Sequence, residues 1–255
     1  MDINILLNEI YLINKQVGYY VEHLIIQNKH KLLKKEKLVA AFDFDNTLIN
    51  GDIEEAFFAM MINKGFKTEL KWEKYLELSK NGNQQIAYTE IKKDLIKLNE
   101  EDIKTIFSEI YKNLNKFIEF KDGNKVYQII NPKPNILMKI LIEILKQLEF
   151  KIYIVSASLK SLILYANKHW FLLDEDKILA SCQFSDNFNI IYGNEKEAIL
   201  KKNGVENLLI SAGDNIGDIH FLNMTISNGL CLIRNTSNAN EIIPKLNKDK
   251  NIILF

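Results

Sequence analysis

The hydrophobic positions along the chain fall into short apolar runs separated by segments with helical spacing. Runs with the length of a buried strand lie at 38–42, 150–155, 208–212, 229–233 and 252–254. Amphipathic helices are predicted between several of them, at about 135–148, 159–172 and 194–203. Strands that alternate with helices predict an α/β fold with a doubly wound, mostly parallel, Rossmann-like sheet.

Two segments depart from this alternation. Residues 3–28 carry apolar residues at helical spacing and predict one long amphipathic helix, which would pack on the core or on a partner. Residues 52–119 are almost entirely helix-forming, and no strand pattern interrupts them. Because this block directly follows the first strand, it predicts an inserted helical cap domain at 51–129, in a core domain made of 1–50 and 130–255.

Composition and charge narrow the class of protein. The chain has 255 residues, of which 47% are hydrophobic and 26% charged, as in a globular protein. Lys and Arg together number 33, as do Asp and Glu, so the net charge is zero and we expect no nucleic-acid partner. A lysine-rich run at 29–37 is expected to be a solvated helix end.

The sequence also bears on location and redox chemistry. No apolar run reaches the length of a membrane span, and the amino terminus lacks the features of a secretory signal, so we expect a cytoplasmic protein. Cys182 and Cys231 lie in apolar stretches, without a CxxC motif, and are expected to be buried small hydrophobic residues.

Two carboxylates one residue apart, Asp43 and Asp45, end the first apolar run. In open α/β sheets, ligands bind beyond the carboxyl ends of the strands, which is where these acids would lie. Their spacing allows one to reach a site with its side chain and the other with its backbone carbonyl, which suits a hard divalent cation such as Mg²⁺. Taken alone, the pattern is also typical of an ordinary helix-capping turn after a core strand.

Two further predicted strands also end in polar groups. Ser156 follows the second, Asp214 and Asp218 follow the third, and Lys196 begins a helix between them. In a parallel sheet these strand ends face the same edge, so we expect the side chains to converge. Mg²⁺ would neutralise the carboxylates, and together with Lys196 and Ser156 it would hold a phosphoryl group.

The order and spacing of these residues resemble the four motifs of the haloacid dehalogenase (HAD)-like hydrolase superfamily: DxDxT, a strand-terminal Ser, a downstream Lys and GDxxxD. The resemblance covers the core from Leu38 to about Ile233. The helical insertion between the first two motifs resembles the cap of the phosphoserine phosphatase-like branch. The resemblance implies an α/β core with a helical cap, and a Mg²⁺-dependent phosphatase.

The resemblance also implies a role for each residue. Asp43 would be the nucleophile that forms an aspartyl-phosphate. Asp45 would be the general acid for the leaving alcohol and then the general base for the hydrolytic water. Thr47 and Ser156 would hold the phosphoryl oxygens or the loop, and Lys196 would steady the nucleophile and offset the charge of the phosphate.

The metal ligands implied by the resemblance come from two of the motifs. Asp43, the backbone carbonyl of Asp45 and Asp214 would bind Mg²⁺, and Asp218 would join them directly or through water.

The predicted substrate is a small phosphorylated metabolite. Asp52 lies where the phosphoserine-type enzymes carry an acid that meets the amine of the substrate, although it could instead cap the first cap helix. Those enzymes use a cap arginine for the substrate carboxylate, whereas the single arginine of this chain, Arg234, follows the core. The segment 156–158 looks more like the phosphocholine- and phosphoethanolamine-type relatives. We therefore expect an amino-alcohol phosphate or phosphoserine.

Two other functions remain open at this stage. A phosphotransferase would pass the same aspartyl-phosphate to an alcohol other than water. A non-catalytic binding module would use the same fold with its cap and amino-terminal helix as interaction surfaces, although buried carboxylates without a function are costly. The sequence identifies no protein partner.

Overall fold

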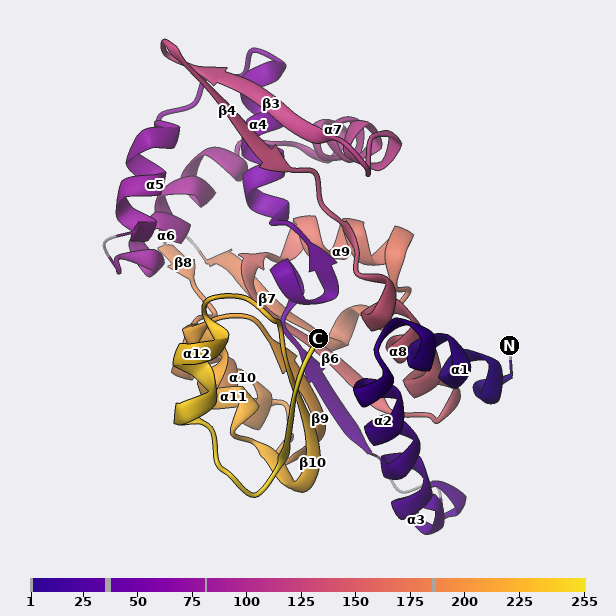
Figure 1. The fold of residues 1–255 in the computed structure, drawn as a ribbon. Helices are drawn as coiled ribbons and strands as arrows, with labels where there is room; N and C mark the ends of the chain where they lie inside the picture. Colours follow the sequence, from indigo (N-terminus) through magenta and orange to yellow (C-terminus); the bar gives the residue numbers. More distant parts are fainter. Residues whose placement is uncertain (1, 35–37, 81, 185–186) are drawn as a thin grey trace.

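The first acidic motif follows β1 (Val39–Phe42), the central strand of the main sheet (Figure 1). The computed structural model describes residues 2–34, 38–80, 82–184 and 187–255. Within them, the main sheet has seven strands in the order β11-β10-β9-β1-β6-β7-β8, parallel except for β8 against β7. The other strands of this sheet are β6 (Lys151–Leu159), β7 (Ile178–Phe184), β8 (Asn187–Asn189), β9 (Leu208–Gly213), β10 (Thr225–Ile233) and β11 (Asn251–Leu254).

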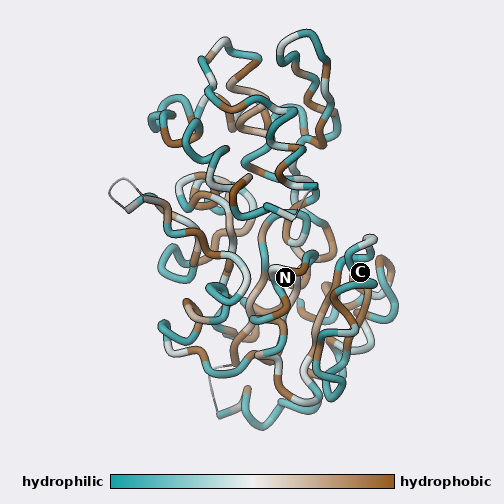
Figure 2. Tube along the Cα trace, turned by 90° about the vertical axis from the view of Figure 1, so that its left-hand side faces the viewer, coloured by the Kyte–Doolittle hydropathy of each residue, from teal (hydrophilic) through white to brown (hydrophobic). Residues whose placement is uncertain are grey.

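Successive side chains of each strand point to opposite faces of this sheet, and helices cover both faces. Ala40 and Phe42 belong to the hydrophobic cluster of one face, and Ala41 to that of the other. On the first face lie α1 (Ile3–Ile13), α2 (Lys15–Gln27), α8 (Ile136–Gln147) and α9 (Lys160–Trp170); on the second lie α10 (Asn194–Lys202), α11 (Ile219–Leu222) and α12 (Ala239–Ile242). The doubly wound α/β fold is confirmed, and Figure 2 shows how hydrophobic and hydrophilic stretches alternate along the chain.

The prediction of one long amino-terminal helix at 3–28 is wrong. Asn14 has an extended backbone (φ −148°, ψ 100°), which ends α1, and its side chain accepts a hydrogen bond from the Val17 N–H at 3.1 Å, which caps α2. The two helices pack on each other, α1 packs on α8, and α2 packs on β10 and β11. A short α3 (Lys29–Leu33) follows; residues 35–37 of the lysine-rich run lie outside the described residues.

The sequence predicted a helical insertion after β1, but the insertion also contains a β-hairpin. It contains α4 (Ile53–Asn63), α5 (Trp72–Lys80), α6 (Gln84–Leu95) and α7 (Glu100–Lys112), followed by an antiparallel hairpin of β3 (Phe117–Asp122) and β4 (Lys125–Ile130). In β3, buried Ile118 and Phe120 alternate with exposed neighbours, so the hairpin covers one side of the helices. We call residues 51–129, together with Ile130 at the end of β4, the cap.

The cap joins the core through two neighbouring chain segments. The first, β2 (Ile49–Asn50), pairs antiparallel with the second, β5 (Lys133–Pro134). Pro134 belongs to this pair, and α8 begins after it at Ile136, capped by Asn135, whose side chain accepts from the Met138 N–H. In Figure 1 the cap lies above the edge of the sheet from which the first acidic motif emerges.

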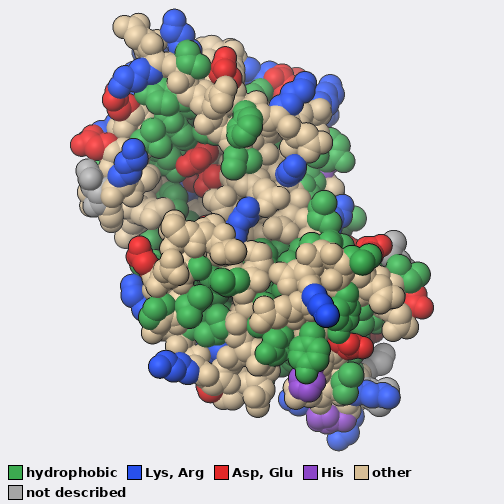
Figure 3. All heavy atoms as spheres, viewed as in Figure 1, with side chains coloured by type: hydrophobic (Ala, Val, Ile, Leu, Met, Phe, Trp, Pro, Cys, Tyr) green, Lys and Arg blue, Asp and Glu red, His purple; other side chains and the backbone are tan. Residues whose placement is uncertain are grey.

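The surface and the cysteines complete this description. Within the described residues, no helix is both long enough and apolar enough to cross a membrane. Lysines and acidic side chains are interspersed over the face shown in Figure 3. Cys231 is buried in β10 as expected, but the expectation is wrong for Cys182, which is exposed on β7 close to the edge of the sheet.

Replacing Ile10 tests whether the amino-terminal helices are part of the core. Ile10 is fully buried in α1, so Ile10→Ala is expected to lower the free energy of unfolding by about 2–5 kcal/mol through lost burial and a cavity. Leu12 of the same helix is 88% exposed, and Leu12→Ala should change it by less than about 0.5 kcal/mol. Chemical denaturation of both variants measures the difference; equal values would show that α1 does not contribute to the core.

Candidate active site

A pocket of about 200 Å³ lies between the carboxyl edge of the sheet and the cap. The residues singled out from the sequence that line it are Asp43, Asp45, Asp52, Ser156, Lys196 and Asp214. Asp218 contacts this group from a fully buried position. Thr47 is also fully buried but does not line the pocket, and its hydroxyl has no hydrogen-bond partner within the described residues.

Lys196 lies between two carboxylates from different parts of the chain. Its Nζ is 2.5 Å from Oδ1 of Asp43, at the end of β1, and 2.6 Å from Oδ1 of Asp218, after β9. All three side chains are almost completely buried. Burial by itself would lower the pKa of Lys196, but the two carboxylates raise it above its ordinary value, so the ammonium group is charged.

A third carboxylate, that of Asp214, lies beside the two that contact Lys196. Oxygens of Asp43, Asp214 and Asp218 lie within 4.8 Å of one another. Burial, together with the neighbouring acids, raises the pKa of Asp43 to about 7 and that of Asp214 well above its usual range. Three carboxyl groups thus converge with only one ammonium group beside them, and their oxygens form a donor set that fits a hard divalent cation.

Asp218 has little free hydrogen-bonding capacity. Its Oδ1 accepts from Lys196, and its Oδ2 accepts from the backbone N–H groups of Asp214 (3.0 Å) and Asn215 (3.1 Å). A Cβ atom at Gly213 would lie 2.6 Å from Oδ2, so the turn needs glycine there. Asp218 therefore holds the turn that carries Asp214.

Asp45 is held away from the three-carboxylate cluster. Its Oδ1 accepts the N–H of Ile53, the first residue of α4, at 2.7 Å, and its Oδ2 accepts the hydroxyl of Ser158 at 2.6 Å. Burial, and then the charges of Asp52 and Asp43, raise the pKa of Asp45 well above its usual range. Asp45 therefore lies where the core meets the cap, in an environment that favours its protonated form.

The cap wall of the pocket is acidic and aromatic. Asp52 caps α4 by accepting the Glu55 N–H at 2.9 Å, and it also lines the pocket, so its two alternative roles are compatible. Glu55 accepts the hydroxyl of Tyr75 at 3.1 Å, and Tyr88 lies beside them in the wall. Burial raises the pKa of Asp52, and burial together with Asp52 raises that of Glu55 to about 8.

Sequence reasoning missed several of these residues. Tyr75, Tyr88 and Tyr192 line the pocket, but nothing in the local sequence pattern distinguishes them. Tyr192 packs so closely on Gly217 that a Cβ there would lie 2.3 Å from its ring. Glycine at this position makes room for the tyrosine in the pocket wall.

Arg234 also contributes to the site, although the sequence suggested only that it follows the core. Its Nη1 donates to the carbonyl oxygens of Asn46 (2.5 Å) and Ile49 (3.2 Å), and its Nη2 donates to Oδ1 of Asn50 (2.8 Å). The planar guanidinium thus ties the turn after Asp45 and the start of the cap linker to the end of β10. Its partners are 184 to 188 residues away in the chain, so no local pattern could reveal the contact.

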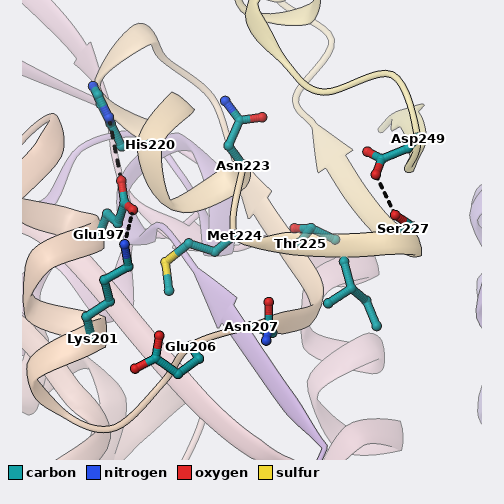
Figure 4. A pocket seen from close by; sticks show the side chains of 11 residues that line it. Glu197, Lys201, Glu206, Asn207, His220, Asn223, Met224, Thr225, Ser227 and Asp249 are labelled. Atoms are coloured by element: carbon teal, nitrogen blue, oxygen red, sulfur yellow. Dashed lines mark hydrogen bonds and ion pairs between the residues drawn. The ribbon is translucent and has the colours of Figure 1, made fainter.

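A larger hollow, of about 700 Å³, lies at the opposite edge of the sheet, near the start of β9 and β10 (Figure 4). Two of its three acidic side chains, Glu197 and Asp249, already have partners. Glu197 pairs with Lys201 at 2.6 Å and lies 3.7 Å from His220, while Asp249 accepts from Ser227 at 2.5 Å. Size alone therefore does not identify the functional site, which we place at the smaller pocket with its convergent acids.

Comparison with known proteins identifies the fold. No family model matches the chain, and no curated protein sequence matches it. A solved phosphoserine phosphatase, described as an analogue of its phospho-aspartyl intermediate, is similar in structure, with a TM-score of 0.51 and 18% identity over 85% of this chain and 93% of that chain. A phosphoserine phosphohydrolase-like protein from Francisella tularensis subsp. tularensis SCHU S4 has a TM-score of 0.53 and 19% identity, over 85% and 94% of the two chains.

A HAD family hydrolase from Salmonella enterica serovar Typhi is also similar, with a TM-score of 0.51 and 13% identity, over 91% of this chain and 76% of that chain. At identities this low, the structural similarity establishes the fold alone. The expected resemblance is confirmed at that level: the chain has the fold of the HAD-like hydrolases, in the form that phosphoserine phosphatases share.

Proposed function

We propose that this protein is a Mg²⁺-dependent phosphatase that hydrolyses a small phosphomonoester through an aspartyl-phosphate on Asp43. The observation that carries the proposal is the position of Asp43. Its carboxylate lies in the pocket, 2.5 Å from the ammonium group of Lys196 and beside the carboxylate of Asp214. A carboxylate placed next to a fixed positive charge and a cation site is suited to attack on phosphorus.

The metal would be held by Asp43, Asp214 and the backbone carbonyl of Asp45. Asp218 would act through water, because both of its oxygens already accept hydrogen bonds. Bound Mg²⁺ supplies positive charge that offsets the phosphoryl oxygens. The same charge would lower the pKa of Asp43 from about 7 and keep the nucleophile ionised at neutral pH.

The two aspartates of the first motif divide the chemistry. Asp43 attacks phosphorus as the bond from phosphorus to the alcohol oxygen breaks, and Asp45 gives its proton to that oxygen. Asp45, now a carboxylate, takes a proton from the water that attacks the aspartyl-phosphate, which releases phosphate and restores Asp43. Lys196 offsets the charge of the phosphoryl group, and the cap (residues 51–129 with the end of its hairpin) would exclude bulk water.

The charges of the pocket favour a phosphomonoester with a positively charged alcohol. Among the described residues that line the pocket, Lys196 is the single basic side chain, and it already lies between two carboxylates. A substrate carboxylate would therefore meet Asp52 and Glu55 without a cationic partner. An ammonium group would instead meet two acids and the rings of Tyr75 and Tyr88. An amino-alcohol phosphate such as phosphoethanolamine or phosphocholine fits this wall better than phosphoserine.

The direct test is a screen of small phosphomonoesters with Mg²⁺. We expect wild-type protein to release phosphate, and Asp43→Asn to reduce the rate by roughly 10³-fold or more because the nucleophile is lost. Asp249→Asn, an exposed change at the opposite edge of the sheet, should retain full activity. If wild-type protein releases no phosphate while Asp43→Asn binds protein partners normally, the binding-module interpretation holds instead.

Thermal unfolding tests the cation site without relying on activity. At Mg²⁺ concentrations near one hundred times Kd, binding should stabilise the wild type by about 2.7 kcal/mol, a rise in Tm on the order of 5–10 °C. Asp214→Asn should lose this rise. Its Tm in chelator should not fall below that of wild type, because one of three crowded carboxylates has been neutralised. An equal rise in both proteins would argue against this site.

Neutralising Asp52 tests the charge of the substrate. Asp52→Asn keeps an N-cap acceptor for α4 but removes a carboxylate from the pocket. We expect kcat/KM for phosphoethanolamine to fall at least about tenfold through loss of a charge-assisted contact, and that for glycerol 3-phosphate to stay within about threefold. Equal turnover of phosphoserine and phosphocholine by wild-type protein would remove the argument for a cationic substrate.

A further inference from the structure

Asp45 is held at both oxygens, by donors from two different bodies of the protein. The core contributes the hydroxyl of Ser158, 2.6 Å from Oδ2, and the cap contributes the N–H of Ile53, 2.7 Å from Oδ1. Ser158 is 4% exposed and lines the pocket. The carboxyl plane of Asp45 therefore cannot rotate without breaking one of the two bonds.

The backbone around Ser158 is shaped to aim this hydroxyl. The parallel pairing of β6 with β7 shifts register between Ser156 and Leu159, so the strand is irregular at this point. Such irregularities redirect side chains at the ends of strands. The N–H of Ser158 is satisfied by Oγ of Ser156 at 3.0 Å, which holds the redirected segment in place.

The next residue ties the same segment to the cap. The N–H of Leu159 donates to Oε1 of Glu54 at 2.8 Å, and Oε2 of Glu54 accepts from Nζ of Lys92 at 2.7 Å. Glu54 is 2% exposed and Lys92 0%, so neither charge is solvated. Because Glu54 follows Ile53 in α4, the two contacts fix the start of this helix against the segment that carries Ser158.

We propose that Ser158 is a positioning residue for proton transfer by Asp45. The inference rests on the proposed phosphatase function. When the bond from phosphorus to the alcohol oxygen breaks, that oxygen takes the proton of Asp45, and Asp45 becomes a carboxylate. Ser158 donates its hydroxyl proton to a lone pair of Oδ2 that both the acid and the carboxylate keep, so this bond persists before and after the proton of Asp45 leaves. Ser158 thereby keeps the carboxyl group aimed at the leaving oxygen.

If Ser158 has this role, the effect of removing its hydroxyl depends on the leaving group of the substrate. An alkoxide is too basic to leave without a proton, so an alkyl phosphate depends on a correctly aimed Asp45. Acetate leaves as a stable anion at neutral pH, so hydrolysis of acetyl phosphate does not depend on a correctly aimed Asp45. Loss of a positioning hydroxyl should therefore affect the first substrate and spare the second, whereas a general structural defect would affect both.

The test compares two substrates in Ser158→Ala. One is acetyl phosphate, and the other is the alkyl phosphomonoester that wild-type protein turns over fastest in the screen. The measured quantity is kcat/KM, which covers the steps through release of the leaving group and excludes hydrolysis of the shared aspartyl-phosphate. We expect kcat/KM to fall about tenfold or more for the alkyl phosphate and less than about threefold for acetyl phosphate.

Two variants control for folding and chemistry. Ser181→Ala removes another buried hydroxyl of β7, one that accepts the Ile191 N–H at 2.9 Å and does not line the pocket, and it should leave the ratio of the two kcat/KM values unchanged. Ser158→Thr keeps a hydroxyl and should keep most of the wild-type ratio. Unchanged or equally reduced values for both substrates in Ser158→Ala would overturn the positioning role while leaving the phosphatase intact. Failure of wild-type protein to hydrolyse either substrate would overturn both.

Discussion

The ammonium group of Lys196 lies 2.5 Å from Asp43 and 2.6 Å from Asp218, and the rest of the site depends on this buried arrangement. Removing the charge of Lys196 would leave buried carboxylates without a positive partner, which is strongly destabilising. The three residues come from the end of β1, the start of α10 and the turn after β9. The charge set therefore fixes three segments at one edge of the sheet and presents Asp43 to the pocket.

A second constraint joins the cap to this edge. The acid-bearing turn is bonded to the core by Ser158 and Arg234, and to the cap by the N–H of Ile53. Asp45 thus has its observed environment only when the cap and core are together, because each supplies one donor to its carboxyl group. Burial by the same two bodies raises the pKa of Asp45, so the geometry and the protonation state of the acid have a common origin.

Much of this could be predicted from the sequence because it depends on local pattern and chain order. Apolar runs that end in Asp43, Ser156 and Asp214 indicate strands whose carboxyl ends carry polar groups. A parallel sheet brings such ends to one edge whatever the detailed packing, so the convergence with Lys196 followed from topology. The absence of a cap arginine was likewise evident from composition, and it already weakened the case for a substrate carboxylate.

Other features were decided by tertiary structure, because they depend on where side chains point. The break at Asn14 and the hairpin of the cap were overlooked, since apolar spacing continues through the first and the helical character of the block obscured the second. Ser158, Tyr88 and Arg234 contact the site from elements distant in the chain. The sequence alone determined which chemical groups reach the edge of the sheet, whereas folding decided which of them face the pocket, because burial and packing set the direction of each side chain.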